Sequence, residues 1–116
     1  MKTQIGSLEV VNIKQVKQIT EEHVYIGRKN SYYNVQASAL ANPYHVGKDG
    51  DRDKVILKYR YWLWELVQNK ESEQMEELVR IANMVREGKN VKLMCYCKPL
   101  ACHGDVVKRA VEWLLK

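Results

Sequence analysis

A dense apolar run late in the chain constrains its fold more than any other feature. Residues 91–97 read Val-Lys-Leu-Met-Cys-Tyr-Cys, which predicts a buried and therefore central β-strand. In the two segments before it, apolar residues recur at helical spacing, so the strand follows two helices. The first helix is expected to be capped by Asp51 and broken by residues 69–71. The second is expected to run from a cap at Ser72 to a C′ residue at Gly88.

Two shorter strands and one more helix complete the expected pattern. Leu8–Ile13 and Val24–Arg28 are apolar and rich in β-branched residues, so both are predicted strands, and their connection is compatible with a hairpin. Apolar spacing predicts a last helix from about Gly104 to Leu115. Because two helices separate the second and third strands, these strands should pair in parallel. We therefore expect a small single α/β domain over residues 1–116, with a short, mostly parallel sheet of about three strands flanked by three helices.

Composition and charge narrow the class of protein. No stretch of the 116 residues approaches the ~20 apolar residues of a membrane span, and the start has no apolar leader segment. We therefore expect a cytoplasmic protein without a membrane partner. The net charge of +5, from 19 basic and 14 acidic residues, fits an anionic partner. Because the basic residues are scattered among the acids, nucleic acid stays open as a partner but is not favoured.

The predicted topology brings polar and reactive residues to one edge of the sheet. The carboxyl ends of parallel strands meet there, so residues 27–30 and 95–97 should lie together with the start of the last helix at residues 102–105. The long loop over residues 29–50, which contains Tyr32, Tyr33, Tyr44 and His45, is too aromatic for a plain linker. A ligand-binding or reactive site is therefore expected at this edge.

All three cysteines lie in one eight-residue segment at this edge, residues 95–102, which a histidine follows directly. This cluster supports three interpretations. In the first it is structural, since cysteine packs like a small apolar side chain. In the second it binds zinc through Cys95, Cys97, Cys102 and His103, although adjacent ligands strain one tetrahedron and the spacing departs from the usual knuckle.

The third interpretation is a reactive thiolate. Cys102 at a helix N-terminus should have a pKa below the free value of about 8.5, with His103 and His45 as base or orienting partner. It predicts that Cys102 reacts with thiol reagents faster than Cys95 and Cys97. An odd number of cysteines in one short segment also indicates a reducing compartment rather than a disulfide framework. We expect no bound metal and no cofactor.

Four motifs follow one another in a fixed order: Val24–Arg28, Ala41–Gly47, Gly50–Asp53 leading into Tyr59–Trp64, and Cys95–Asp105. Together they resemble the domain-of-unknown-function family 4326, small proteins of phages and bacteria, over roughly residues 8–115. The most distinctive motif is C-x-C-x-P-x-x-C-H-G-D. The family usually has glycine before the Asn-Pro pair and phenylalanine after it, where this chain has Ala41 and Tyr44. The resemblance implies the fold and the site, and the host cytoplasm if a phage encodes the chain, but no activity.

These observations predict a pocket for a small phosphorylated or nucleotide-like ligand, which the protein binds or also modifies. Arg28 and Lys29 suit its anionic groups, and the amides of Asn30 and Asn42 suit a base or sugar edge. The other expected ligand contacts are stacking rings at Tyr44 and Tyr96, and contacts from Cys97, Gly104 and Asp105. The alternative is a zinc-binding or purely structural adaptor that contacts nucleic acid or protein. Trp64, off the main apolar stripe of its helix, is a candidate for self-association into a homo-oligomer.

Overall fold

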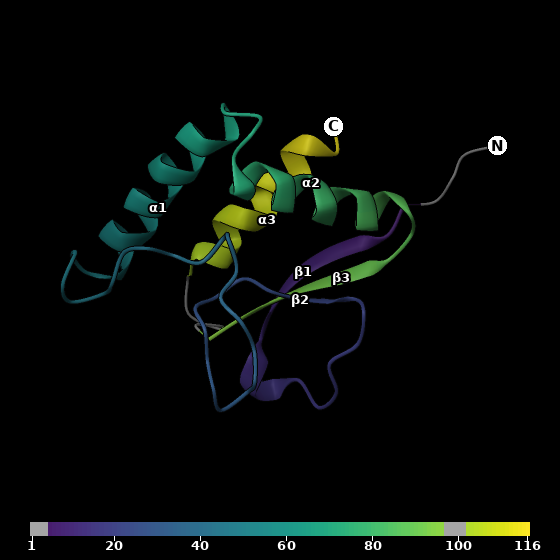
Figure 1. The fold of residues 1–116 in the computed structure, drawn as a ribbon, viewed down its shortest axis with the longest axis horizontal. Coiled ribbons are helices and arrows are strands. Elements are labelled where there is room, and N and C mark those ends of the chain that lie inside the picture. The colour runs from purple at the N-terminus through teal and green to yellow at the C-terminus, as the bar shows by residue number, and fades with distance from the viewer. Residues whose placement is uncertain (1–4, 97–101) are drawn as a thin grey trace.

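The computed structural model describes residues 5–96 and 102–116, which form one three-stranded sheet and three α-helices (Figure 1). The strands are β1 (Ser7–Asn12), β2 (His23–Tyr25) and β3 (Asn90–Cys95), and a 3-10 turn, η1 (Ile13–Gln15), follows β1. The helices are α1 (Arg52–Val67), α2 (Glu73–Arg86) and α3 (His103–Leu114). The predicted small α/β domain is confirmed.

β3 is the central strand, and both β1 and β2 run parallel to it. Leu8 of β1 pairs with Val91, and Val24 of β2 pairs with Leu93. The predicted parallel pairing of the second and third strands is therefore confirmed, with α1 and α2 between them in the chain. The hairpin suggested between the first two strands is wrong, because β1 and β2 flank β3 on opposite sides and run in the same direction.

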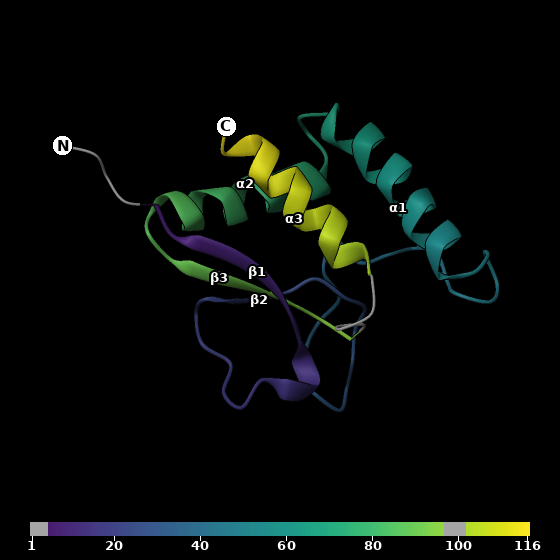
Figure 2. The same ribbon diagram turned by 180° about the vertical axis from the view of Figure 1, so that it is seen from behind.

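The domain has two layers, with α2 and α3 on the same side of the sheet in both views (Figures 1 and 2). Side chains of β3 alternate, so that Val91, Leu93 and Cys95 enter the core on the helix side. The helices fill this core with buried aliphatic side chains: Leu78, Ile81, Ala82 and Val85 of α2, and Val107 and Val111 of α3. β3 ends at Cys95, and Cys97, the predicted end of this strand, lies outside the described residues.

β2 ends at Tyr25, three residues before the predicted end at Arg28. The Ile26 N–H still donates to the carbonyl oxygen of Met94 at 3.2 Å. The chain then turns at Gly27, where an added Cβ would lie 2.5 Å from the Tyr25 hydroxyl oxygen, so a larger residue would require the Tyr25 side chain to move. This turn ends the ladder and leaves Arg28 in the loop beyond the sheet edge.

Local capping fixes the helices as the sequence predicts. The Asp51 side chain accepts the Lys54 N–H at 2.9 Å at the start of α1, and Ser72 accepts the Met75 N–H at 3.1 Å at the start of α2. Gly88 has a φ of +95° after α2, which glycine adopts without strain. Among the described residues, no helix combines the length and the apolar character that crossing a membrane requires.

Candidate functional site

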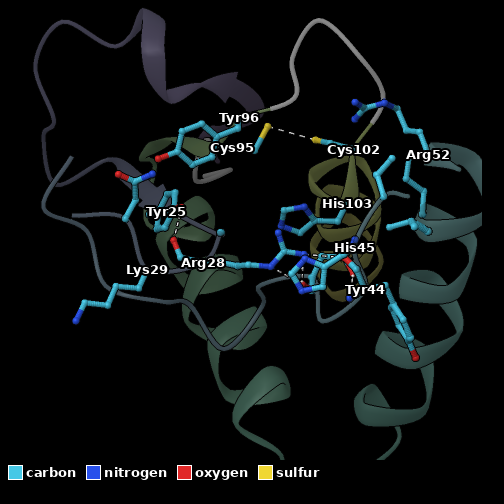
Figure 3. A pocket seen from close by; sticks show the side chains of 16 residues that line it. Tyr25, Arg28, Lys29, Tyr44, His45, Arg52, Cys95, Tyr96, Cys102 and His103 are labelled. Carbon is cyan, nitrogen blue, oxygen red and sulfur yellow. Dashed lines mark hydrogen bonds between the residues drawn. The ribbon is translucent and has the colours of Figure 1, made fainter. Parts of the chain in front are cut away.

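A cavity of about 440 Å³ lies at the carboxyl ends of β2 and β3, at the sheet edge where the sequence predicts a site (Figure 3). The first turns of α1 and α3 and the loop around residues 42–46 complete its wall. Most predicted site residues reach this wall: Arg28, Lys29, Asn30, Asn42, Tyr44, His45, Cys102 and His103. Cys97 belongs to the undescribed segment, so its predicted ligand contact stays a prediction.

Gly104 and Asp105 lie in the first turn of α3, beside the cavity, but neither is among the residues that line it. An added Cβ at Gly104 would lie 2.8 Å from Val10 Cγ1 and 3.2 Å from Ile26 Cδ1, so Gly104 lets the helix approach the sheet. Asp105 accepts the Cys102 N–H at 3.3 Å in a capping box. The structure thus gives these two residues packing and capping roles and lends no support to direct ligand contacts.

Arg28 holds the loop that closes one side of the cavity. Its Nε and Nη2 atoms donate to the carbonyl oxygen of Asn42 at 3.1 and 2.8 Å, and Nη2 also donates to the carbonyl oxygen of Tyr44 at 2.7 Å. A guanidinium has five N–H donors, and the two on Nη1 bind no acceptor in the described part of the chain. Arg28 can therefore position the loop and still offer a charge and two donors to a ligand.

The two wall amides also keep their donors for a ligand. Oδ1 of Asn42 accepts the Tyr44 N–H at 2.9 Å, and Oδ1 of Asn30 accepts the Tyr33 N–H at 3.3 Å. These bonds fix which end of each amide is the oxygen. Neither Nδ2 atom is bonded within residues 5–96 and 102–116.

Tyr25 and Tyr96 pack edge to face at the strand ends, with ring centroids 6.3 Å apart. Burial is the largest cause, and the neighbouring Tyr96 the next, of a rise in the pKa of Tyr25 to about 12. The Tyr25 hydroxyl therefore stays protonated, and it donates to the carbonyl oxygen of Arg28. The Tyr96 hydroxyl is buried, and it forms no hydrogen bond of normal geometry with the described residues. Both rings are placed to contact a flat ligand group.

Cys102 is the N-cap of α3, as the sequence predicts, and its Sγ accepts the Gly104 N–H at 3.3 Å. The same Sγ lies 3.2 Å from Sγ of Cys95 at the end of β3 (Figure 3). The two residues are only 2% and 1% exposed, yet both line the cavity. The amide donor and the helix N-terminus favour a negative charge on the Cys102 sulfur, whereas burial opposes it.

The two predicted histidine partners of Cys102 differ in environment. His103 is buried, and its Nε2 donates to the carbonyl oxygen of Ile26 at 2.7 Å. His45 is exposed, and its backbone N–H donates to Asp49 Oδ2 at 2.8 Å. No hydrogen bond joins either imidazole to the Cys102 sulfur among the residues that the structure describes, so the role of base stays a prediction for both.

Lys29 and Tyr44 reach the wall, but in Figure 3 their side chains extend away from the two sulfur atoms. The ring of Tyr44 lies 5.9 Å from Lys58 Nζ, which also donates to the carbonyl oxygen of Asp49 at 2.8 Å. One face of this ring thus has a cation over it already. Of the two rings predicted to stack, Tyr96 is therefore better placed than Tyr44, and Tyr25 lies beside Tyr96.

Sequence reasoning missed two polar wall residues, Tyr25 and Arg52. Each carried a usable signal. Tyr25 stands in the second predicted strand, two residues before the sheet-edge segment, and Arg52 directly follows the cap of the first predicted helix. Whether these two side chains line the same cavity depends on the distance between α1 and β2 in the folded chain, and the spacing of residues in the sequence does not give that distance.

The zinc interpretation requires four ligands around one point. The sulfur atoms of Cys95 and Cys102 are adjacent, the bond from Nε2 of His103 to a carbonyl oxygen leaves Nδ1 as the ring atom that could bind a metal, and Cys97 is not described. Among residues 5–96 and 102–116, no three histidine, cysteine or acidic side chains gather in a way that could hold a metal ion.

A second hollow of about 710 Å³ lies between α1 and α3. Its wall includes the exposed aromatic residues Tyr61, Trp64 and Trp113, and the ring centroids of the two tryptophans are 6.2 Å apart. It is larger than the cavity at the sheet edge, but among the described residues no cysteine, histidine or amide side chain lines it. Of these two hollows, the smaller one therefore holds the described cysteine and histidine side chains.

One comparison with known proteins gave a match. A family described as Domain of unknown function (DUF4326) matches residues 11–113, which covers all the elements described above except the start of β1 and the end of α3. No curated protein and no solved structure matches the chain.

Proposed function

The chain belongs to the DUF4326 family, and we propose that it binds a small phosphorylated or nucleotide-like ligand in the cavity at the carboxyl edge of its sheet. The observation that carries this proposal is the charge of the wall. Arg28, Lys29 and Arg52 line the cavity, and no aspartate or glutamate does so among the described residues. A wall with cations and without acids attracts an anion and repels a cation.

The hydrogen-bonding groups of the wall favour the same class of ligand. The amide oxygens of Asn30 and Asn42 are occupied by backbone N–H groups, which leaves their Nδ2 donors. Nη1 of Arg28 adds two more donors. A ligand rich in acceptor oxygens, such as a phosphate ester, complements such a wall better than an amine or a sugar alone.

Size and shape support a nucleotide-like ligand rather than a bare anion. A volume of about 440 Å³ is within the range of small-molecule sites. The edge-to-face pair of Tyr25 and Tyr96 borders the cavity and offers apolar ring surface to a base. Cys102 and His103 on the same wall extend the proposal from binding to processing of the ligand, with Cys102 as nucleophile.

The direct test is calorimetric titration with nucleoside monophosphates and with the matched nucleosides, alongside inorganic pyrophosphate. We expect at least one monophosphate to bind, its nucleoside to bind at least roughly tenfold more weakly, and added salt to weaken the binding. Equal binding of a nucleoside and its monophosphate, or no binding of any of these compounds, would contradict the proposal. Tighter binding of short RNA would favour the adaptor alternative instead.

A pair of arginines on one helix supplies a matched control. Arg52 lies in the cavity wall, whereas Arg60, eight residues further along α1, lines the other hollow. We expect Arg52→Gln to weaken binding of the monophosphate by roughly tenfold and Arg60→Gln to leave it unchanged. Equal effects of the two substitutions would indicate a general influence of net charge rather than a contact in this cavity.

A further inference from the structure

The two described cysteines lie close enough to react with each other. Sγ of Cys95 at the end of β3 is 3.2 Å from Sγ of Cys102 at the start of α3, and a disulfide requires about 2.05 Å. Only a small approach of the helix start and the strand end separates the two states. We propose that Cys95 and Cys102 are a redox-active dithiol, which a hydroperoxide that enters the cavity converts to an intramolecular disulfide.

The surroundings of the pair assign different roles to its members. Sγ of Cys102 accepts the Gly104 N–H at 3.3 Å and lies at the N-terminus of α3, and both features stabilise a thiolate. Asp105, whose carboxylate accepts the Cys102 N–H at 3.3 Å, opposes this with its negative charge. Cys95 and Cys102 both belong to the buried core, so the helix N-terminus and its amide are what distinguish Cys102. Cys102 is therefore the attacking sulfur, and Cys95 resolves the product.

Two steps account for all atoms and electrons. The Cys102 thiolate attacks one peroxide oxygen, the O–O bond breaks, and Cys102 becomes a sulfenic acid while hydroxide (or alkoxide) leaves and takes a proton. The Cys95 thiol then attacks the sulfenic sulfur, the S–S bond forms, and water leaves with the Cys95 proton. The two thiols lose two electrons, and the peroxide gains them. A dithiol reductant reverses the change by thiol–disulfide exchange.

The cavity supplies the access that this chemistry needs. Both residues are almost completely buried, at 1% and 2% exposure, so a large oxidant cannot reach them from bulk solvent. Both also line the cavity, which admits a molecule as small as hydrogen peroxide. The inference concerns the sulfur pair alone and does not depend on the anionic ligand proposed above.

The experiment is oxidation of the full native chain with hydrogen peroxide, followed by alkylation of the remaining thiols and mass spectrometry without reduction. Chymotryptic cleavage after Tyr96 and after Leu100 separates the three cysteines into different peptides. We expect an intramolecular link between the peptides of Cys95 and Cys102, alkylation of Cys97, and full reversal by dithiothreitol. A link that involves Cys97, or links only between chains, would overturn the proposal.

Two serine variants distinguish the loss of a reactive sulfur from a loss of folding. Cys102→Ser retains a good N-cap, so α3 should form, but the chain should no longer form the intramolecular link. Cys97→Ser should form the link to the same extent as the wild-type chain, because it retains both partners. If Cys97→Ser keeps its native circular dichroism and yet retains both thiols under peroxide that oxidises the wild-type chain, the assignment is wrong.

Discussion

Nε2 of His103 lies 2.7 Å from the carbonyl oxygen of Ile26. A carbonyl oxygen only accepts hydrogen bonds, so Nε2 carries the ring proton and Nδ1 carries the lone pair. The imidazole packs edge to face on the ring of Tyr59, with centroids 5.1 Å apart. Through this one side chain, the first turn of α3 is joined to the residue that follows β2 and to the middle of α1.

This environment makes stability depend on pH in a definite direction. Burial lowers the pKa of His103 below its usual 6.5; the bond to Ile26 and the charge of Asp105 partly oppose this shift, and the charge of Arg28 adds to it. The unfolded chain therefore binds a proton at His103 before the native chain does. The free energy of unfolding should fall as pH drops below about 6.5, until the native ring also protonates.

Urea unfolding at pH about 7.5 and about 5.5 measures this loss, and the His103→Gln variant should lose less stability between these two values than the wild-type chain. His45→Gln is the matched control, because His45 is exposed, and its pH dependence should equal that of the wild-type chain. The same pH dependence in His103→Gln as in the wild-type chain would assign the effect to other groups.

Gly104 controls how closely α3 approaches the sheet. Gly104→Ala would improve helix propensity by about 1 kcal/mol, but its Cβ would lie 2.8 Å from Val10 Cγ1. Since overpacking typically costs about 1–3 kcal/mol, we expect net destabilisation in urea unfolding. Glu112→Ala on the exposed side of α3 should change stability by less than about 0.5 kcal/mol. A stabilised Gly104→Ala would show that the helix start can move away from β1.

Arg28 should order the loop at residues 42–44 through its bonds to two backbone carbonyls. A lysine at this position keeps the charge but lacks the planar guanidinium that reaches both acceptors. For Arg28→Lys we expect faster amide hydrogen exchange across this loop. The free energy of unfolding should fall by about 1 kcal/mol or less, because the Arg28 side chain is exposed. Lys29→Arg, at the neighbouring exposed position, should leave exchange in the loop unchanged.

The fold followed from the sequence where short-range rules decide it. Asp51 and Ser72 cap their helices as their residue types predict, and the apolar density of residues 91–97 correctly indicated a central strand. The parallel pairing followed from the two intervening helices. The pairing of β1 with β3 could not be predicted from the sequence, because no helix between β1 and β2 indicates on which side of the sheet β1 pairs.

The position of the cavity at this sheet edge was predictable, but the contacts that its wall residues make were not. The carboxyl edge of a parallel sheet identified Arg28, Cys102 and His103 together. That Arg28 binds backbone carbonyls, and that His103 binds the Ile26 carbonyl rather than Cys102, depends on tertiary distances that no spacing rule contains.

We expect the purified chain to contain no stoichiometric zinc. Cys102 and His103 are adjacent in the chain, which strains a single tetrahedral site, and no three histidine, cysteine or acidic side chains of the described residues gather in a way that could hold a metal ion. Elemental analysis of the native chain checks this expectation. About one zinc per chain, lost together with the fold on chelation, would contradict it and favour the adaptor alternative.

The last prediction concerns the order in which the cysteines react. Cys95 and Cys102 are almost equally buried, at 1% and 2% exposure, so access does not distinguish them. The Gly104 N–H and the helix N-terminus favour the thiolate of Cys102 alone. Under reducing conditions at neutral pH, Cys102 should therefore be alkylated faster than Cys95 and Cys97. A bound nucleoside monophosphate should slow its alkylation by covering the wall. Time-resolved alkylation with chymotryptic mapping gives the three rates, and Cys102 as the slowest of the three would identify it as a packing residue.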